Sequence, residues 1–255
     1  MSDSLPSARI LFASDALEIG YLPGSSGQLV VVFSSIGESH EIARGLPARN
    51  EFIGSVSASG RRHVLFVKDN MRSWFTHQGV RDLWQAVALS SIRLIRPSHV
   101  TTLGLSMGGY AAIRFARLLG AEAALAFSPQ FSVEQSVVRD KRWHRFLHQV
   151  DMAREPTVSP EDIGGGRYFA LFGGDAGRDR KHAERFLKIP GVRVLRTEGG
   201  YHNFPRQLKA QGLLDRLIAA VIDGGDPSAQ PEFKLSAYDS PASVPADPAE
   251  AEQHG

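Results

Sequence analysis

The stretch Thr101-Thr102-Leu103-Gly104-Leu105-Ser106-Met107-Gly108-Gly109-Tyr110 contains the motif Gly-x-Ser-x-Gly. An apolar segment, 99–103, leads into it, and a helix-like segment, 110–119, follows it. A strand that turns sharply into a helix holds the serine at its apex in a strained conformation, with the hydroxyl projecting from the turn. Glycines two residues before and after the serine let strand and helix approach closely. The stretch therefore predicts a nucleophile at Ser106, against the alternative of a Gly-rich turn with an incidental serine.

The composition is that of one large globular α/β domain, with 255 residues of which 42% are apolar and 22% charged. The absence of cysteine excludes disulfides, thiolate metal sites and a cysteine nucleophile. No apolar run approaches the roughly 18 residues of a membrane span, and residues 1–8 lack a signal-peptide core, so we expect a cytoplasmic protein. The net charge is +2, and no Lys/Arg cluster with interleaved aromatics indicates nucleic-acid binding.

Short apolar runs alternate with helix-like segments along the chain. The alternation predicts a three-layer α/β/α sandwich around a mostly parallel sheet, with a hairpin at its start. The expected strands are 9–13, 17–22, 29–33, 63–67, 99–103, 123–127, 168–172 and 192–195, and the expected helices are 80–94, 110–119, 180–187 and 206–222.

Composition divides the chain into a domain over 1–223 and a tail over 224–255. The tail is rich in Pro, Ala and acidic residues and is predicted to be disordered, although Phe233, Leu235 and Tyr238 could dock locally. Within the domain, residues 130–166 are more than a crossover helix needs, and they predict a small cap.

A serine nucleophile needs a base, and the base needs an acid to orient it. In open parallel sheets such groups follow the carboxyl ends of strands. His202 follows the strand 192–195 by a short loop, and Asp175 follows the strand 168–172 directly. Asp179, four residues later, is the alternative acid, but it also suits the N-cap of the helix 180–187. We therefore favour the set Ser106, Asp175 and His202, in the Ser-Asp-His chain order known from serine hydrolases.

Acyl transfer at a serine also needs donors for the oxyanion. One donor should be the backbone N–H of Met107, directly after the nucleophile. The second should come from the loop after the strand 29–33, where we favour the N–H of Ile36 and keep Ser35 as the near alternative. The same loop could also be a plain turn whose serines cap the following helix, since only its backbone is required.

On these residues the chain resembles the α/β-hydrolase superfamily. The resemblance covers roughly residues 9–222 and rests on 29–37, 104–109, 168–175 and 201–202. It implies a serine-hydrolase mechanism on esters, thioesters or amides. The His-Gly pair usual before the oxyanion residue is absent, and Ser34-Ser35 stands in its place. The runs 66–69, 72–75 and 126–130 are also similar to small bacterial hydrolase-like proteins linked to surface polysaccharides.

The segment that carries part of this second resemblance follows a predicted strand at its carboxyl end. Trp74 and Phe75, with Arg72, could line a cleft and stack on a sugar ring or an acyl chain. Alternatively the segment is structural, with Lys68 and Asp69 forming an ion pair and the aromatic rings filling gaps under a loop. The residues themselves favour neither interpretation.

The sequence indicates no metal and no cofactor, since His144 and His148 lack the glutamate of a metalloprotease helix and no phosphate-binding loop follows the first parallel strand. It predicts a cofactor-free serine hydrolase that cleaves a small-molecule ester or thioester through an acyl-enzyme. The alternatives are an acyltransferase, or a hydrolase-fold assembly factor in polysaccharide export whose site has decayed.

Overall fold

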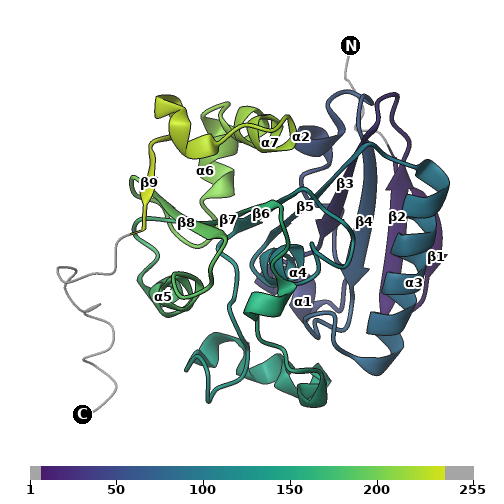
Figure 1. Ribbon diagram of the computed structural model, residues 1–255. Coiled ribbons are helices and arrows are strands. Elements are labelled where there is room, and N and C mark those ends of the chain that lie inside the picture. The colour runs from purple at the N-terminus through teal and green to yellow at the C-terminus, as the bar shows by residue number, and fades with distance from the viewer. Residues whose placement is uncertain (1–6, 239–255) are drawn as a thin grey trace.

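The structure is a computed structural model that describes residues 7–238 (Figure 1). Its strands are β1 Arg9–Ala13, β2 Leu17–Leu22, β3 Gln28–Phe33, β4 His63–Asp69, β5 His99–Leu105, β6 Ala123–Phe127, β7 Arg167–Phe172, β8 Val192–Thr197 and β9 Leu235–Ala237. Its α-helices are α1 Ser39–Ala43, α2 Ile53–Ser57, α3 Gln78–Ile95, α4 Met107–Arg114, α5 Arg180–Phe186, α6 Pro205–Ala210 and α7 Leu214–Ile222.

All nine strands form one sheet in the order β1-β2-β4-β3-β5-β6-β7-β8-β9. The six central strands, from β4 to β8 in that order, run parallel to their neighbours. The hairpin of β1 and β2 adds antiparallel to β4, and β9 adds antiparallel to β8. The sheet is therefore mostly parallel, as the alternation of strands and helices predicts.

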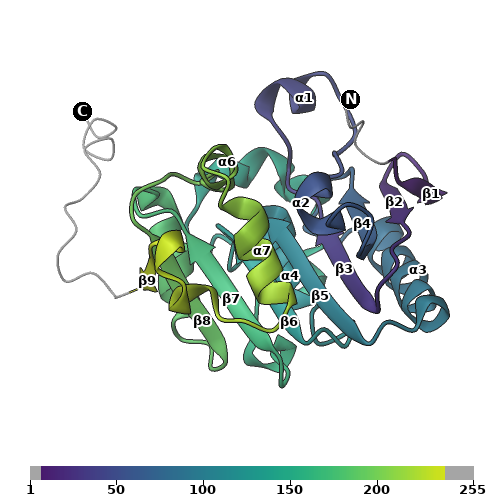
Figure 2. The same cartoon turned by 90° about the horizontal axis from the view of Figure 1, so that it is seen from above.

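Helices cover both faces of the sheet, because the central strands carry apolar side chains on both sides. Val31 and Phe33 of β3 belong to the core cluster that also contains buried residues of α3, α4 and α5. Val30 and Val32 point the other way, into a cluster with α2, α6 and α7. Figure 2 shows α7 lying across one face of the sheet. The predicted three-layer α/β/α sandwich is confirmed.

The predicted helix 206–222 is two helices. It breaks between α6 and α7, where Gly212 adopts a left-handed conformation with φ 71°. Glycine reaches this region without the steric cost that other residues carry, and it commonly ends a helix. The positions at helical spacing after Leu208 are Gln211 and Gly212, so the apolar periodicity is interrupted at the break.

The prediction of disorder from Gly224 onward is wrong for residues 224–238, which pack on the domain. Two 3-10 turns, η5 Pro227–Ala229 and η6 Pro231–Phe233, lead into β9. Phe233 is buried in the second core cluster, and the ring of Tyr238 lies 5.9 Å from that of Phe172. A few apolar anchors and one strand pairing offset the chain entropy that the composition suggested would prevail. Residues 239–255 of the predicted tail lie outside the described part of the chain.

The insertion 130–166 contains no α-helix and folds as short 3-10 helices, η1 Lys141–Gln149, η2 Met152–Arg154 and η3 Pro160–Asp162. Buried side chains such as Phe131 and Phe146 anchor it to the core cluster that also holds α4 and α5. Among residues 7–238, no helix is both long and apolar enough to cross a membrane.

The packing of the C-terminal segment predicts a stability cost. Replacing Phe233 by Ala should lower the free energy of unfolding by about 3 kcal/mol, because it removes a buried ring. The neighbouring Glu232→Ala should cost less than about 1 kcal/mol, because it removes an exposed ion pair with Arg216. Urea unfolding of the two variants checks this, and equal stabilities would mean that the segment does not contribute to the core.

Candidate active site

The side chains of the predicted site follow the carboxyl ends of parallel strands, which meet at one edge of the sheet. The loop 34–37 follows β3, Ser106 follows β5, and Asp179 and His202 lie beyond β7 and β8. The topology thus assembles one site from segments that are far apart in the chain.

Ser106 stands at a sharp turn between β5 and α4. Its backbone has φ 58° and ψ −117°, a conformation that costs a non-glycine residue free energy. A Cβ on Gly104 would lie 2.3 Å from the backbone of Gly108, and one on Gly108 would lie 2.1 Å from the carbonyl oxygen of Phe33. Both glycines are therefore required, and the turn predicted from the motif is present.

Asp179, and not Asp175, pairs with the predicted base. Asp179 Oδ2 lies 2.7 Å from His202 Nδ1, and its side chain is 3% exposed. Asp179 does occupy the N-cap position of α5, the alternative predicted from the sequence, but its carboxylate makes no capping hydrogen bond to that helix. The 3-10 turn η4 Gly177–Asp179 follows Asp175, and its last residue, Asp179, is the one that contacts the histidine.

Asp175 supports the loop that carries His202. It is exposed, its Oδ2 accepts a 2.9 Å hydrogen bond from the N–H of Gly200, and its own N–H donates to the Gly200 carbonyl at 2.8 Å. Ser128 Oγ holds the other side of this loop by donating to the carbonyl of His202 at 2.8 Å. The favoured assignment of Asp175 as the partner of the histidine is corrected to Asp179.

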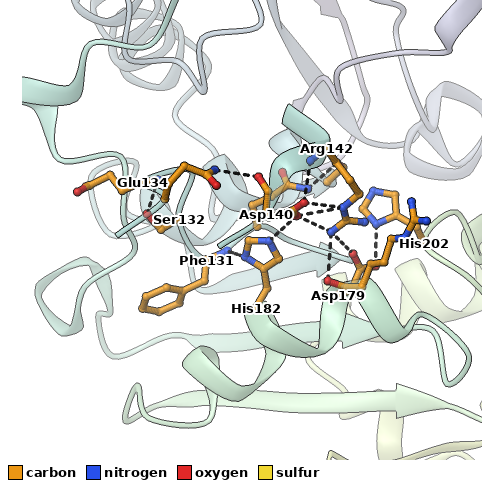
Figure 3. A network of polar contacts seen from close by, with 12 residues as sticks. Phe131, Ser132, Glu134, Asp140, Arg142, Asp179, His182 and His202 are labelled. Atoms are coloured by element: carbon orange, nitrogen blue, oxygen red, sulfur yellow. Dashed lines mark hydrogen bonds and ion pairs between the residues drawn. The ribbon is translucent and has the colours of Figure 1, made fainter. Parts of the chain in front are cut away.

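An ion pair within the insertion, between Asp140 and Arg142, contacts Asp179, as Figure 3 shows. Arg142 Nη2 lies 2.8 Å from Asp179 Oδ1 and 2.7 Å from Asp140 Oδ2. Burial raises the pKa of Asp179, but the hydrogen bonds and charges of His202 and Arg142 outweigh it and hold that pKa below its usual value. Asp179 is therefore ionised at neutral pH, as the partner of a protonated histidine must be.

His182 completes the row on the far side of Asp140. Its Nδ1 accepts a 2.9 Å hydrogen bond from the N–H of Phe131, so the proton of the neutral ring is on Nε2, which lies 3.1 Å from Asp140 Oδ2. Burial lowers the pKa of His182. No sequence signal identified Asp140 or Arg142, because the insertion has no regular apolar pattern from which the positions of its side chains could be predicted.

The loop after β3 leaves one backbone donor free. The N–H groups on either side of Ile36 have acceptors: that of Ser35 lies 3.3 Å from both carboxylate oxygens of Glu51, and that of Gly37 donates to Ser35 Oγ at 3.1 Å. Within residues 7–238 the Ile36 N–H has no acceptor. Met107 begins α4, so its N–H also lacks a partner within the helix. These two free donors are the ones predicted from the sequence.

A cleft of about 590 Å³ opens at this edge of the sheet, and both Ser106 and His202 line it. Ile36, Phe52 and Leu105 contribute apolar surface, and Trp143 is the insertion's contribution to its wall. The volume suits a small molecule or the end of a larger one. The Trp143 ring lies 6.0 Å from that of His202, centroid to centroid.

The segment 68–75 is structural and does not offer aromatic rings to the cleft. Trp74 and Phe75 are fully buried, and Lys68 forms its ion pair with Glu18 and not with Asp69. Arg72 links three loops by donating to the carbonyls of Ile36, Asn70 and Leu46 at 3.1, 2.6 and 2.8 Å. Its bond to Ile36 ties the segment to the loop with the free N–H.

Glu51 is a carboxyl group in the cleft wall that sequence reasoning missed. Its carboxylate is bound by the backbone N–H of Ser35 and, through a short contact, by the Ser35 hydroxyl. No cation pairs with it among the described residues. Burial raises its pKa to about 7, although the bonds from Ser35 act in the opposite direction.

This shift predicts a pH dependence of stability. Between about pH 4.5 and 7 the folded protein binds a proton at Glu51 that the unfolded chain has released, so stability falls as pH rises through this window. Glu51→Gln removes the contribution. The unfolding free energy of the wild type, relative to this variant, should therefore decline from pH 4.5 to 7 and stay level above it. Urea unfolding at stepped pH values checks this, and a constant difference would contradict it.

No protein-family model matches the chain, and neither does any curated protein. Solved structures do match its fold. A capsule O-acetyltransferase of Neisseria meningitidis serogroup A has a TM-score of 0.59 at 12% identity, over 88% of this chain and 97% of that one. XC6422 from Xanthomonas campestris, an α/β serine hydrolase without a lid, has a TM-score of 0.52 at 15% identity, over 82% and 92%.

FphF, a fluorophosphonate-binding serine hydrolase of Staphylococcus aureus, has a TM-score of 0.51 at 12% identity, over 85% of this chain and 97% of that one. At such identities the likeness concerns the fold and not the chemistry. The matches extend over most of each chain, so they concern the whole α/β fold described above. The chain therefore has the α/β-hydrolase fold.

Proposed function

We propose that this protein is a serine hydrolase that cleaves an ester or thioester through an acyl-enzyme, with Ser106, His202 and Asp179 as its triad. One observation carries the proposal: a serine at a strained strand-to-helix turn shares a cleft with a histidine whose Nδ1 is bound to a buried carboxylate. A structural turn has no need of that combination. Serine hydrolases need all three groups, because a serine hydroxyl is a weak nucleophile at neutral pH.

In the proposed reaction, Ser106 Oγ attacks the acyl carbon as His202 takes its proton. Asp179 holds the imidazole by its Nδ1–H and stabilises the imidazolium that forms. The carbonyl oxygen of the substrate becomes an oxyanion, which the free N–H groups of Ile36 and Met107 receive. His202 then returns the proton to the leaving group, and an activated water releases the acyl group from Ser106 by the same steps in reverse.

The nucleophile is tested by covalent labelling. A fluorophosphonate probe should label the wild type at Ser106, while Ser106→Ala should stay unlabelled and His202→Ala should react much more slowly, since the serine then lacks its base. Mass spectrometry of the labelled peptide checks the site. Equal labelling of wild type and Ser106→Ala would remove Ser106 as the nucleophile.

The two aspartates provide a matched pair for kinetics. Asp179→Asn should lower kcat by about three to four orders of magnitude, because the histidine loses the carboxylate that fixes its tautomer. Asp175→Asn should keep kcat within about tenfold, because this exposed carboxylate binds only the loop backbone. Steady-state kinetics on a chromogenic ester checks both variants, and a reversed order would give the role to Asp175.

The acyl acceptor is tested separately. With a labelled acyl donor, release of free acid at an unchanged rate when polyols or oligosaccharides are added identifies water as the acceptor. Transfer of label to the added hydroxyl compound would instead identify an acyltransferase. No turnover of acetyl, medium-chain acyl or thioester donors would favour a binding or assembly role for the fold.

A further inference from the structure

The residue that contacts the hydroxyl of Ser106 most directly is Gln130. It is the third residue after β6, at the same edge of the sheet as the other site residues, and it is fully buried. Its Nε2 donates a 2.8 Å hydrogen bond to Ser106 Oγ. This contact lies outside the triad and the oxyanion donors.

The orientation of the Gln130 amide is fixed by a second buried side chain. Trp74 Nε1 lies 3.3 Å from Gln130 Oε1. An indole N–H only donates, so the atom that faces it must be the amide oxygen, and the NH₂ group must therefore face Ser106. A flipped amide would place two donors against each other between two fully buried side chains.

The position of Trp74 depends in turn on Asp69 at the end of β4. Asp69 Oδ2 accepts from the Ser73 N–H at 2.8 Å, the Ser73 hydroxyl at 2.9 Å and the Phe75 N–H at 2.9 Å. Trp74 and Phe75 have φ values of 55° and 59°, which are unfavourable for large side chains. The bonds to Asp69 hold them there, so a buried carboxylate sets the place of the indole that orients Gln130.

A hydrogen bond into Ser106 Oγ has two chemical consequences. It occupies one lone pair of the hydroxyl, so the O–H proton must be directed elsewhere, and the cleft that His202 lines is the open side. It also places a donor beside the oxygen that gains negative charge as its proton leaves. The same donor faces Oγ again when the acyl-enzyme breaks down and Oγ becomes the leaving group.

We propose that Gln130 is a catalytic residue, which donates from Nε2 to Ser106 Oγ in both the formation and the breakdown of the acyl-enzyme, and that Trp74 is the positioning residue that orients its amide. The inference rests on the proposed serine-hydrolase function. It also gives the buried segment 68–75 a role in the site: the segment acts on the nucleophile through Gln130 and does not contact the substrate.

Two substitutions with matched controls test the proposal. Gln130→Met keeps length and burial but removes the donor; Gln28→Met is its control, since Gln28 is also bound at both ends of its amide, to Asp223 and Arg62, at the opposite end of the sheet. Trp74→Phe removes the indole N–H; Trp84→Phe is its control, since Trp84 is equally buried and its Nε1 has no hydrogen-bond partner in the described part of the chain.

The readouts are the rate of fluorophosphonate labelling, kcat and KM on a chromogenic ester, and the melting temperature. We expect Gln130→Met to lower the labelling rate and kcat by about 10- to 100-fold with KM within about twofold, because the lost contact is to the reacting oxygen and not to the substrate. Trp74→Phe should lower both rates by about three- to tenfold. Both control variants should keep labelling and kcat within about twofold of the wild type.

The outcomes separate the two proposals. If the wild type is labelled at Ser106 and Gln130→Met reacts at the same rate, the role of Gln130 is overturned and the hydrolase stands. If rates fall only in proportion to lost melting temperature, in controls and test variants alike, Gln130 is structural and its role is again overturned. If the wild type itself is labelled no more than Ser106→Ala, the hydrolase proposal fails, and the role of Gln130 fails with it. Should Gln130→Met not fold, Trp74→Phe against Trp84→Phe decides.

Discussion

The close approach of β5, α4 and β3 at two glycines is the constraint on which the site depends. Gly108 lies against the carbonyl of Phe33 with no room for a Cβ, and Gly104 lies equally close to Gly108. This contact fixes the strained backbone of Ser106 relative to the loop after β3. The serine hydroxyl and the free N–H of Ile36 are thereby held in one frame before any ligand binds, which is the preorganisation that acyl transfer requires.

Around that frame, charge alternates from the interior to the cleft. Ion pairs link Asp140 to Arg142 and Arg142 to Asp179, and Asp179 in turn binds His202, which is the last group of this row. The charges of Asp140, Arg142 and Asp179 sum to −1 while His202 is neutral. A proton taken up by His202 would therefore bring the net charge of the row to zero. Burial alone would oppose an ionised Asp179, and Arg142 provides the compensating charge. The insertion thus contributes to the electrostatics of the site as well as to its wall.

Sequence patterns predicted the layers of the fold, since β-branched runs and Gly-x-Ser-x-Gly depend on local geometry. They also predicted Ser106, His202 and the two candidate oxyanion donors. They favoured the wrong aspartate, because the turn after β7 brings Asp179 back toward the sheet and no local rule fixes the length of that turn. The roles of Gln130 and Glu51 were not predicted, because they arise from contacts across the fold. Composition favoured disorder over residues 224–238, because it averages over the few apolar residues that matter, although Phe233, Leu235 and Tyr238 were recognisable as possible anchors.

Strand β9 also has a consequence for how this molecule meets others of its kind. It is three residues long, and it pairs with Leu195, Arg196 and Thr197 at the end of β8. Without it, the backbone N–H and C=O groups along that end of β8 would form an open edge, to which a strand of a second chain could add. β9 replaces that edge with one of only three residues, and so short an edge strand offers a second chain few backbone groups to pair with, independently of any chemistry in the cleft.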